Sequence, residues 1–138
     1  MPAKDLLHDY VKNALIKDGW KITDDPLRLK YKGRKLYVDL GAERILAAEK
    51  GEEKIAVEIK SFVGASEMND LENALGQFIF YRAILAETEP ERKLFLAVPD
   101  EIFKTIFEDE FFDLLTKNKL AKVFGVNEEK EEIIGWID

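Results

Sequence analysis

Apolar residues recur at helical spacing in two segments of the chain. In "AKDLLHDYVKNALIKDGW", Leu7, Val11 and Leu15 fall on one helical stripe, and Gly19 is well placed to end the helix. A longer pattern of the same kind runs from Ser66 to about Leu85, with a broad apolar stripe. Both segments are predicted to be amphipathic helices that bury one face.

Short apolar runs predict strands in the rest of the chain. "PLRLKYKGRKLYVDLG" alternates apolar and basic residues on either side of Lys32-Gly33, which predicts a hairpin. "ERILAAEK" and "KIAVEIKSF" flank the short segment "GEE", which predicts a second antiparallel pair with its turn at "GEE". "KLFLAVP" is apolar enough for an interior strand, and "AKVFGVN" with "EIIGWID" predicts a closing pair.

The helical patterns "DEIFKTIF" and "DEFFDLLTKN" follow the interior strand. The order is therefore helix, strands, helix, strand, helices, strands. This order predicts an α/β fold in which a mixed sheet is flanked by helices. No repeat or linker divides the chain, so residues 1–138 are expected to form a single domain.

Composition narrows the chemistry that the chain can perform. The 138 residues contain no cysteine and one histidine, which excludes disulfides, thiolate nucleophiles and Cys-based zinc sites. Any metal would have to be a hard cation held by oxygen ligands. No apolar run is long enough to span a bilayer, and the start of the sequence lacks a signal-peptide pattern, so we expect a cytoplasmic protein without membrane contact.

The charge of the chain is unevenly distributed. A formal net charge of −7 argues against tight, non-specific binding of a polyanion. Basic residues nevertheless gather in "RLKYKGRK": Arg28, Lys30, Lys32, Arg34 and Lys35. This cluster can bind a phosphate backbone locally, or its lysines can simply prevent edge-to-edge strand pairing, and the sequence leaves both interpretations open.

Three charged residues suggest a catalytic constellation. Glu58 and Lys60 share one face of a predicted strand, and Asp39 ends a neighbouring apolar run. If the two strands pair, the carboxylates of Asp39 and Glu58 converge and can bind Mg²⁺ or Mn²⁺, while Lys60 orients water and offsets phosphate charge. The alternatives are a solvated strand face for Glu58 and Lys60, and a turn position before Gly41 for Asp39.

The arrangement resembles the PD-(D/E)XK nuclease superfamily, whose signature is an acidic residue on one core strand and Glu/Asp-x-Lys on the next. The matching residues are Asp39 and "EIK", with Val38 in place of the usual proline. In "QFIFY", Gln77 and Tyr81 match the Gln-x-x-x-Tyr element of RecB-like members and lie on one helix face. The resemblance implies a restriction-endonuclease-like fold with all five residues at the catalytic site, although Gln77 and Tyr81 can also serve packing.

The chain also resembles the XisH family, the fdxN-element excision controlling factors of cyanobacteria. The segments "YVDLGAERILAAEKG", "AVEIKSF" and "LENALGQFIFYRAIL" carry this likeness together with the first helix. The resemblance implies a role in programmed DNA excision in heterocyst-forming cyanobacteria, beside a site-specific recombinase and the companion protein XisI. Two functions follow: a metal-dependent endonuclease acting on DNA, or a non-catalytic accessory factor that binds XisI or the recombinase.

Several further assignments remain open at this point. Glu43 is a possible additional metal ligand, but Gly41 makes its facing uncertain because glycine often marks a bulge. His8 and Asp9 can approach the site from the first helix or lie on its solvated face. Homo-oligomerisation is an expectation drawn from nucleases that pair to cut both strands.

Overall fold

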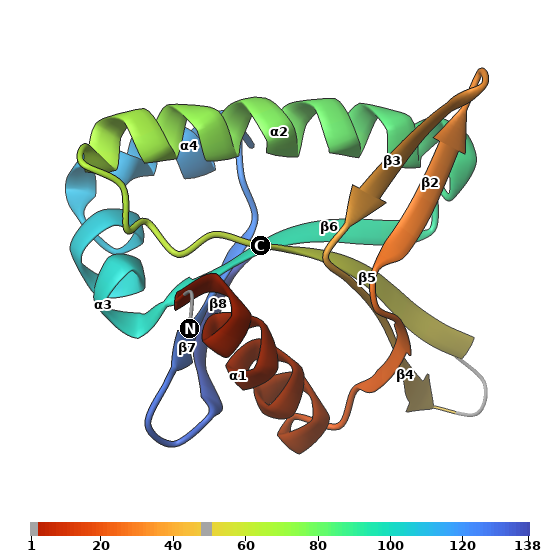
Figure 1. The fold of residues 1–138 in the computed structure, drawn as a ribbon, viewed down its shortest axis with the longest axis horizontal. Coiled ribbons are helices and arrows are strands. Elements are labelled where there is room, and N and C mark those ends of the chain that lie inside the picture. The colour runs from red at the N-terminus through yellow and green to blue at the C-terminus, as the bar shows by residue number, and fades with distance from the viewer. Residues whose placement is uncertain (1–2, 48–50) are drawn as a thin grey trace.

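A six-stranded mixed sheet with helices on both faces organises the chain (Figure 1). The computed structural model describes residues 3–47 and 51–138. In spatial order the sheet contains β1 (Lys21–Asp24), β4 (Leu40–Ala47), β5 (Gly51–Ile59), β6 (Arg92–Pro99), β7 (Val123–Asn127) and β8 (Glu132–Ile137). The three central strands β5, β6 and β7 run parallel, and the outer pairings are antiparallel. The prediction of a mixed α/β fold is therefore confirmed.

The first helix, α1 (Ala3–Lys17), forms as its apolar stripe predicts. Leu7, Val11 and Leu15 are buried, and Gly19 ends the helix with a positive φ of 94°. The backbone N–H of Trp20 donates to the carbonyl of Leu15, which closes the last turn. The sequence pattern did not reveal β1, which follows directly.

The long helix α2 (Glu67–Thr88) is also confirmed. Ser66 caps its N-terminus, because the Ser66 hydroxyl accepts a hydrogen bond from the backbone N–H of Asn69 at 3.2 Å. Leu71, Ala74 and Phe78 lie on its buried face. No helix in residues 3–47 and 51–138 is both long and apolar enough to cross a membrane.

Both predicted hairpins exist, with one correction. Strands β2 (Leu27–Tyr31) and β3 (Arg34–Val38) pair around Lys32-Gly33, whose φ angles of 48° and 83° suit a tight hairpin turn. Strands β4 and β5 also pair, but "GEE" is not their turn. Glu52 and Glu53 belong to β5, where Glu53 accepts a hydrogen bond from Arg44 of β4 at 2.8 Å. A cross-strand ion pair thus lets an acidic segment extend the strand. Residues 48–50, which join the two strands in the sequence, lie outside the described residues.

The two helical patterns after β6 form a chain of short helical turns. These are α3 (Asp100–Ile102), a π-helical turn (Phe103–Phe107), a 3₁₀ turn (Glu110–Phe112) and α4 (Asp113–Lys117). Phe103, Ile106 and Phe107 are buried in this region. The predicted closing pair, β7 with β8, is confirmed.

Two apolar layers lie on opposite faces of the large sheet. Val57 and Ile59 of β5 face the layer under α1, whereas Ala56 faces the layer under α2 and the β2–β3 hairpin. Side chains alternate along a strand, so Glu58 shares the face of Ala56. The candidate site therefore lies on the α2 side of the sheet.

Candidate functional site

Asp39 and Glu58 meet where the hairpin joins the large sheet. Asp39 occupies the bend between β3 and β4, and Glu58 is near the end of β5. Leu40 pairs with Val57 in the antiparallel β4–β5 register, which places Asp39 opposite Glu58. The predicted pairing of the two strands is therefore present.

Each carboxyl group is held by backbone beside the other. The backbone N–H of Asp39 donates to Glu58 Oε1 at 3.3 Å, and the backbone N–H of Ile59 donates to Asp39 Oδ2 at 2.8 Å. The two carboxyl groups are close enough for Asp39 to disfavour ionisation of Glu58 and so raise its pKa. These contacts fix both carboxyl groups at one point, with their remaining oxygen lone pairs available to a ligand.

Glu58 has an unusual protonation equilibrium. Only 7% of the residue is exposed, and this burial, followed by the neighbouring charge of Asp39, raises the pKa of its carboxyl group to about 7. The positive charge of Lys60 opposes part of this shift. Glu58 thus titrates close to neutral pH.

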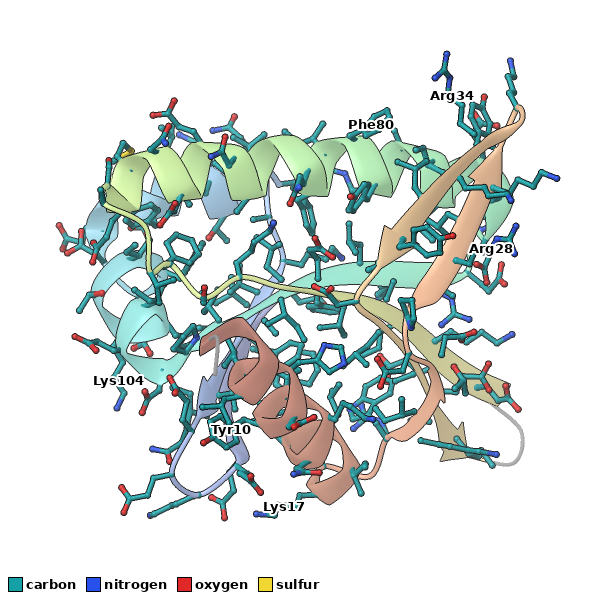
Figure 2. All side chains as sticks on the ribbon, in the orientation of Figure 1. Tyr10, Lys17, Arg28, Arg34, Phe80 and Lys104 are labelled. Atoms are coloured by element: carbon teal, nitrogen blue, oxygen red, sulfur yellow. The ribbon has the colours of Figure 1, made fainter. Side chains whose placement is uncertain are left out.

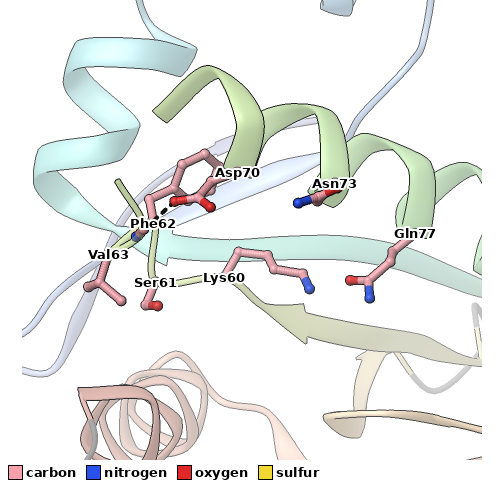
Figure 3. Close-up of a pocket in the computed structure, with 8 residues that line it drawn as sticks. Lys60, Ser61, Phe62, Val63, Asp70, Asn73 and Gln77 are labelled. Atoms are coloured by element: carbon pink, nitrogen blue, oxygen red, sulfur yellow. Dashed lines mark hydrogen bonds between the residues drawn. The ribbon is translucent and has the colours of Figure 1, made fainter. Parts of the chain in front are cut away.

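Lys60 adds a cation at the edge of the carboxylate pair. Its Nζ lies 3.6 Å from Glu58 Oε2. A cleft of about 420 Å³ opens beside it, lined by the segment after β5 and the first half of α2. Figure 3 shows the Lys60 side chain extended along this cleft toward Gln77.

Helix α2 brings Gln77 and Tyr81 to the same region. Within the described residues, Gln77 Oε1 is buried and has no hydrogen-bond partner. Burial, and then the charges of Glu58 and Asp39, raise the pKa of the Tyr81 hydroxyl. The structure thus brings the five residues predicted from sequence to one place, while their catalytic roles remain predictions.

The cleft adds two residues that the sequence reasoning missed. Asp70 and Asn73 line it from the first turns of α2, and Asp70 accepts a hydrogen bond from the backbone N–H of Gly64 at 3.0 Å. Together with Gln77 and Tyr81 they follow one helix face at spacings of three and four residues. This polar stripe, beside the apolar stripe, is the sequence signal by which Asp70 and Asn73 could have been found.

The three open candidates have other contacts. Glu43 pairs with Lys54 in the β4–β5 register, and its Oε1 atom lies 3.8 Å from Lys54 Nζ. Its ion-pair partner is therefore Lys54. The Nε2 atom of His8 is 2.7 Å from Asp25, and Asp9 is exposed on α1. No group of three or more His, Asp or Glu side chains suited to a metal occurs within the described parts of the chain. Asp39 and Glu58 are the two carboxylates that meet beside Lys60.

The sequence and the fold of this chain match those of a known protein family. The sequence matches the family model described as XisH protein over residues 1–134. The chain belongs to the XisH family. A crystal structure of an XisH family protein from Nostoc punctiforme is 43% identical, has a TM-score of 0.85, and the match covers 97% of this chain and 100% of that one. A crystal structure of an fdxN element excision controlling factor protein from Anabaena variabilis is 43% identical, with a TM-score of 0.84 and coverage of 97% and 99%.

No curated protein matches the sequence significantly. The XisH relatives confirm the family resemblance seen in the sequence and the fold of the whole chain. A six-stranded mixed sheet flanked by helices is consistent with a restriction-endonuclease-like arrangement.

Proposed function

We propose that this XisH family protein hydrolyses DNA phosphodiester bonds with Mg²⁺ or Mn²⁺, in the manner of PD-(D/E)XK nucleases. The convergence of Asp39 and Glu58 is the observation that carries this proposal. Glu58 accepts a hydrogen bond from the backbone N–H of Asp39, and Asp39 accepts one from the backbone N–H of Ile59, the residue after Glu58. A structural scaffold gains nothing from placing two carboxyl groups together in a poorly solvated position, because each disfavours ionisation of the other.

The residues present fit a divalent cation. The neighbouring Asp39 charge contributes to the raised pKa of Glu58, so a divalent cation held by these two residues would relieve their repulsion. Carboxylate oxygens are also the ligands that Mg²⁺ and Mn²⁺ prefer. When bound there, such an ion supplies the Lewis acidity that polarises a phosphoryl oxygen.

The other side chains act on the phosphate and its water. The Lys60 ammonium group stabilises negative charge that develops on the phosphate, and it can orient an attacking water. Gln77, with its buried unpartnered oxygen, provides an acceptor at the cleft, and Tyr81 provides a hydroxyl donor beside the carboxyl groups. DNA is supported as the substrate by the relative from Anabaena variabilis, which is named an fdxN element excision controlling factor.

Cleavage of a supercoiled plasmid tests this function. The wild type with Mn²⁺ is expected to convert the plasmid to nicked or linear product, and Lys60→Ala is expected to lower the rate at least about a hundredfold, the typical cost of losing one group that stabilises developing charge. Lys54→Ala is the matched control, because Lys54 belongs to β5, the strand that Lys60 directly follows, but pairs with Glu43. It should cleave at the wild-type rate.

Two results would contradict the nuclease proposal. One is the absence of Mn²⁺-dependent cleavage on any DNA form by protein that is folded and binds the metal. The other is equal cleavage by the wild type and by Lys60→Ala, which would indicate a contaminating nuclease.

A second candidate function has its own supporting observation. An apolar groove of about 280 Å³ lies between the β2–β3 hairpin and α2, and Phe80 at its edge is 56% exposed. Such a groove suits a protein partner. In this alternative the chain is a non-catalytic accessory factor that binds an XisI-like companion or, less directly, the site-specific recombinase.

Co-purification with the XisI-like companion tests the alternative. Phe80→Ser should weaken the complex and leave the protein folded, since Phe80 is exposed at the groove. A complex of unchanged affinity would exclude this groove as the binding surface.

A further inference from the structure

The outer face of the β2–β3 hairpin is basic along its whole length. Along β2, Leu27 and Leu29 are buried against the core while Arg28 and Lys30 are exposed. In the register of the hairpin, Arg28 lies across from Tyr37 and Lys30 lies across from Lys35. Lys32 extends this face in the turn at the tip. Arg34, the fifth cation of the hairpin, pairs with Tyr31 and lines the groove between the hairpin and α2. Figure 2 shows Arg34 near the tip, where the hairpin reaches past α2, and Arg28 nearer its base.

The charge on this face is not neutralised within the protein. Among the described residues, none of the five cations forms an ion pair with a carboxylate, whereas Arg44, Lys54 and Arg92 of the large sheet all do. The hairpin segment 27–38 carries five positive charges and no acidic residue, so the remainder of a chain with net charge −7 carries −12. The cross-strand pair Lys30–Lys35 also places like charges side by side, which costs stability.

Protection of a strand edge does not require such a face. Edge-to-edge pairing is prevented by charged side chains on the edge strand, and it does not call for a continuous cationic face on the hairpin. Here the cations Arg28, Lys30 and Lys35 stand on the broad face of the hairpin, opposite its apolar face. An unpaired cationic face on an otherwise acidic protein is the electrostatic footprint of a polyanion site.

We propose that this basic hairpin face binds the phosphate backbone of duplex DNA and guides it to Asp39 and Glu58. This inference rests on the proposed function, because it takes the carboxylate pair as the place where the bound DNA is cleaved. Asp39 follows β3 directly, so the hairpin rises from the carboxylate site itself (Figure 1). A two-stranded ribbon of five residues is about 17 Å long, and the major groove, about 12 Å wide, admits such a ribbon.

The chemistry of the face favours a duplex over a single strand. Tyr37, which is 52% exposed, is the aromatic residue on this face. Single-strand platforms stack successive bases on several aromatic side chains, whereas duplex backbones are bound mainly by cations. Four cations, Arg28, Lys30, Lys32 and Lys35, with one exposed aromatic residue match the second description.

Metal-free binding of a short DNA duplex, measured by fluorescence anisotropy across a salt series, tests the hairpin. We expect the triple variant Lys30→Gln, Lys32→Gln, Lys35→Gln to bind at least about tenfold more weakly at roughly 0.1 M salt, and to reduce the slope of log affinity against log salt by about 2.7. The control variant Lys104→Gln, Lys117→Gln, Lys119→Gln removes the same charge from exposed lysines elsewhere. It should bind like the wild type.

Three results would overturn the proposal. Equal weakening by the hairpin and control variants would show that only net charge matters. Tighter binding of a single strand of the same length would exclude a duplex site, and equal binding of polyglutamate would identify the face as a surface for an acidic protein. Because the binding assay contains no metal, its result does not depend on the nuclease proposal. If the hairpin variant loses duplex binding and the wild type cleaves no DNA, only the nuclease proposal is contradicted.

Discussion

Glu58 combines burial, a carboxylate neighbour and a cationic neighbour in one residue. Its side chain is 9% exposed, Asp39 contacts it from the bend before β4, and Lys60 lies at 3.6 Å. The first two influences outweigh the third, so the pKa of Glu58 lies at about 7. Between its unfolded pKa near 4.5 and this value, the folded protein holds a proton that the unfolded chain has released.

This residue makes the stability of the metal-free protein depend on pH. The free energy of unfolding should fall as pH rises from 4.5 to about 7, by up to about 3 kcal/mol. Glu58→Gln should abolish this dependence and be more stable than the wild type at pH above 7. Urea unfolding at several pH values in the presence of a chelator measures both effects.

Glu72→Gln is the control for this prediction, because Glu72 is exposed on α2. It should keep the pH dependence of the wild type. Parallel curves for the wild type and Glu58→Gln would show that Glu58 is not the group responsible.

At the residue scale the sequence predicted which side chains meet, but not their electrostatics. Asp39, Glu58 and Lys60 were identifiable because side-chain alternation depends only on position along a strand. The raised pKa of Glu58 depends on burial and on Asp39, which strand pairing brings beside it, and the unpartnered oxygen of Gln77 depends on tertiary packing. No local pattern contains that information.

At the element scale, packing of the helical turns onto β7 depends on the absence of a side chain at Gly125. A Cβ atom there would lie 2.6 Å from the Phe103 ring and 2.9 Å from Ile134. Phe103 itself is buried over this strand, and β7 holds the last parallel position in the sheet. The close approach of the π-helical turn to β7 therefore requires glycine.

Gly125→Ala should lower the free energy of unfolding by about 1–3 kcal/mol, because Phe103 must move to admit the methyl group. Gly76→Ala is the contrasting variant, since Gly76 lies in α2 with open space around its Cα. It should raise stability by about 0.5–1 kcal/mol through helix propensity. Thermal or urea unfolding measures both, and equal stability of Gly125→Ala and the wild type would contradict the packing argument.

Elements with strong periodicity were predictable, and those fixed by context were not. Helix α2 begins at its Ser66 cap and buries its apolar stripe as the pattern indicates. Strand β1 is only four residues long and was missed, because its place depends on pairing with β4. The "GEE" segment was misassigned as a turn, since the Arg44–Glu53 pair that extends the strands is a tertiary contact.

At the scale of the whole molecule, the fold brings distant parts of the sequence to one site. Strand pairing joins Asp39 to Glu58, and the crossover through α2 returns Gln77 and Tyr81 to the same face of the sheet. The basic hairpin then projects from that site (Figure 1). The order of elements predicted a mixed sheet, but it did not predict that β2 and β3 form a separate two-stranded sheet.

Calorimetric titration of Mn²⁺ at pH 8 is the most direct test of the central claim that Asp39 and Glu58 form one divalent-cation site. At this pH Glu58 is mostly ionised, as a metal ligand must be. The wild type should bind Mn²⁺, binding should weaken as pH falls below 7, and Asp39→Asn should abolish it. Unchanged binding in folded Asp39→Asn, or none in the wild type, would contradict the claim.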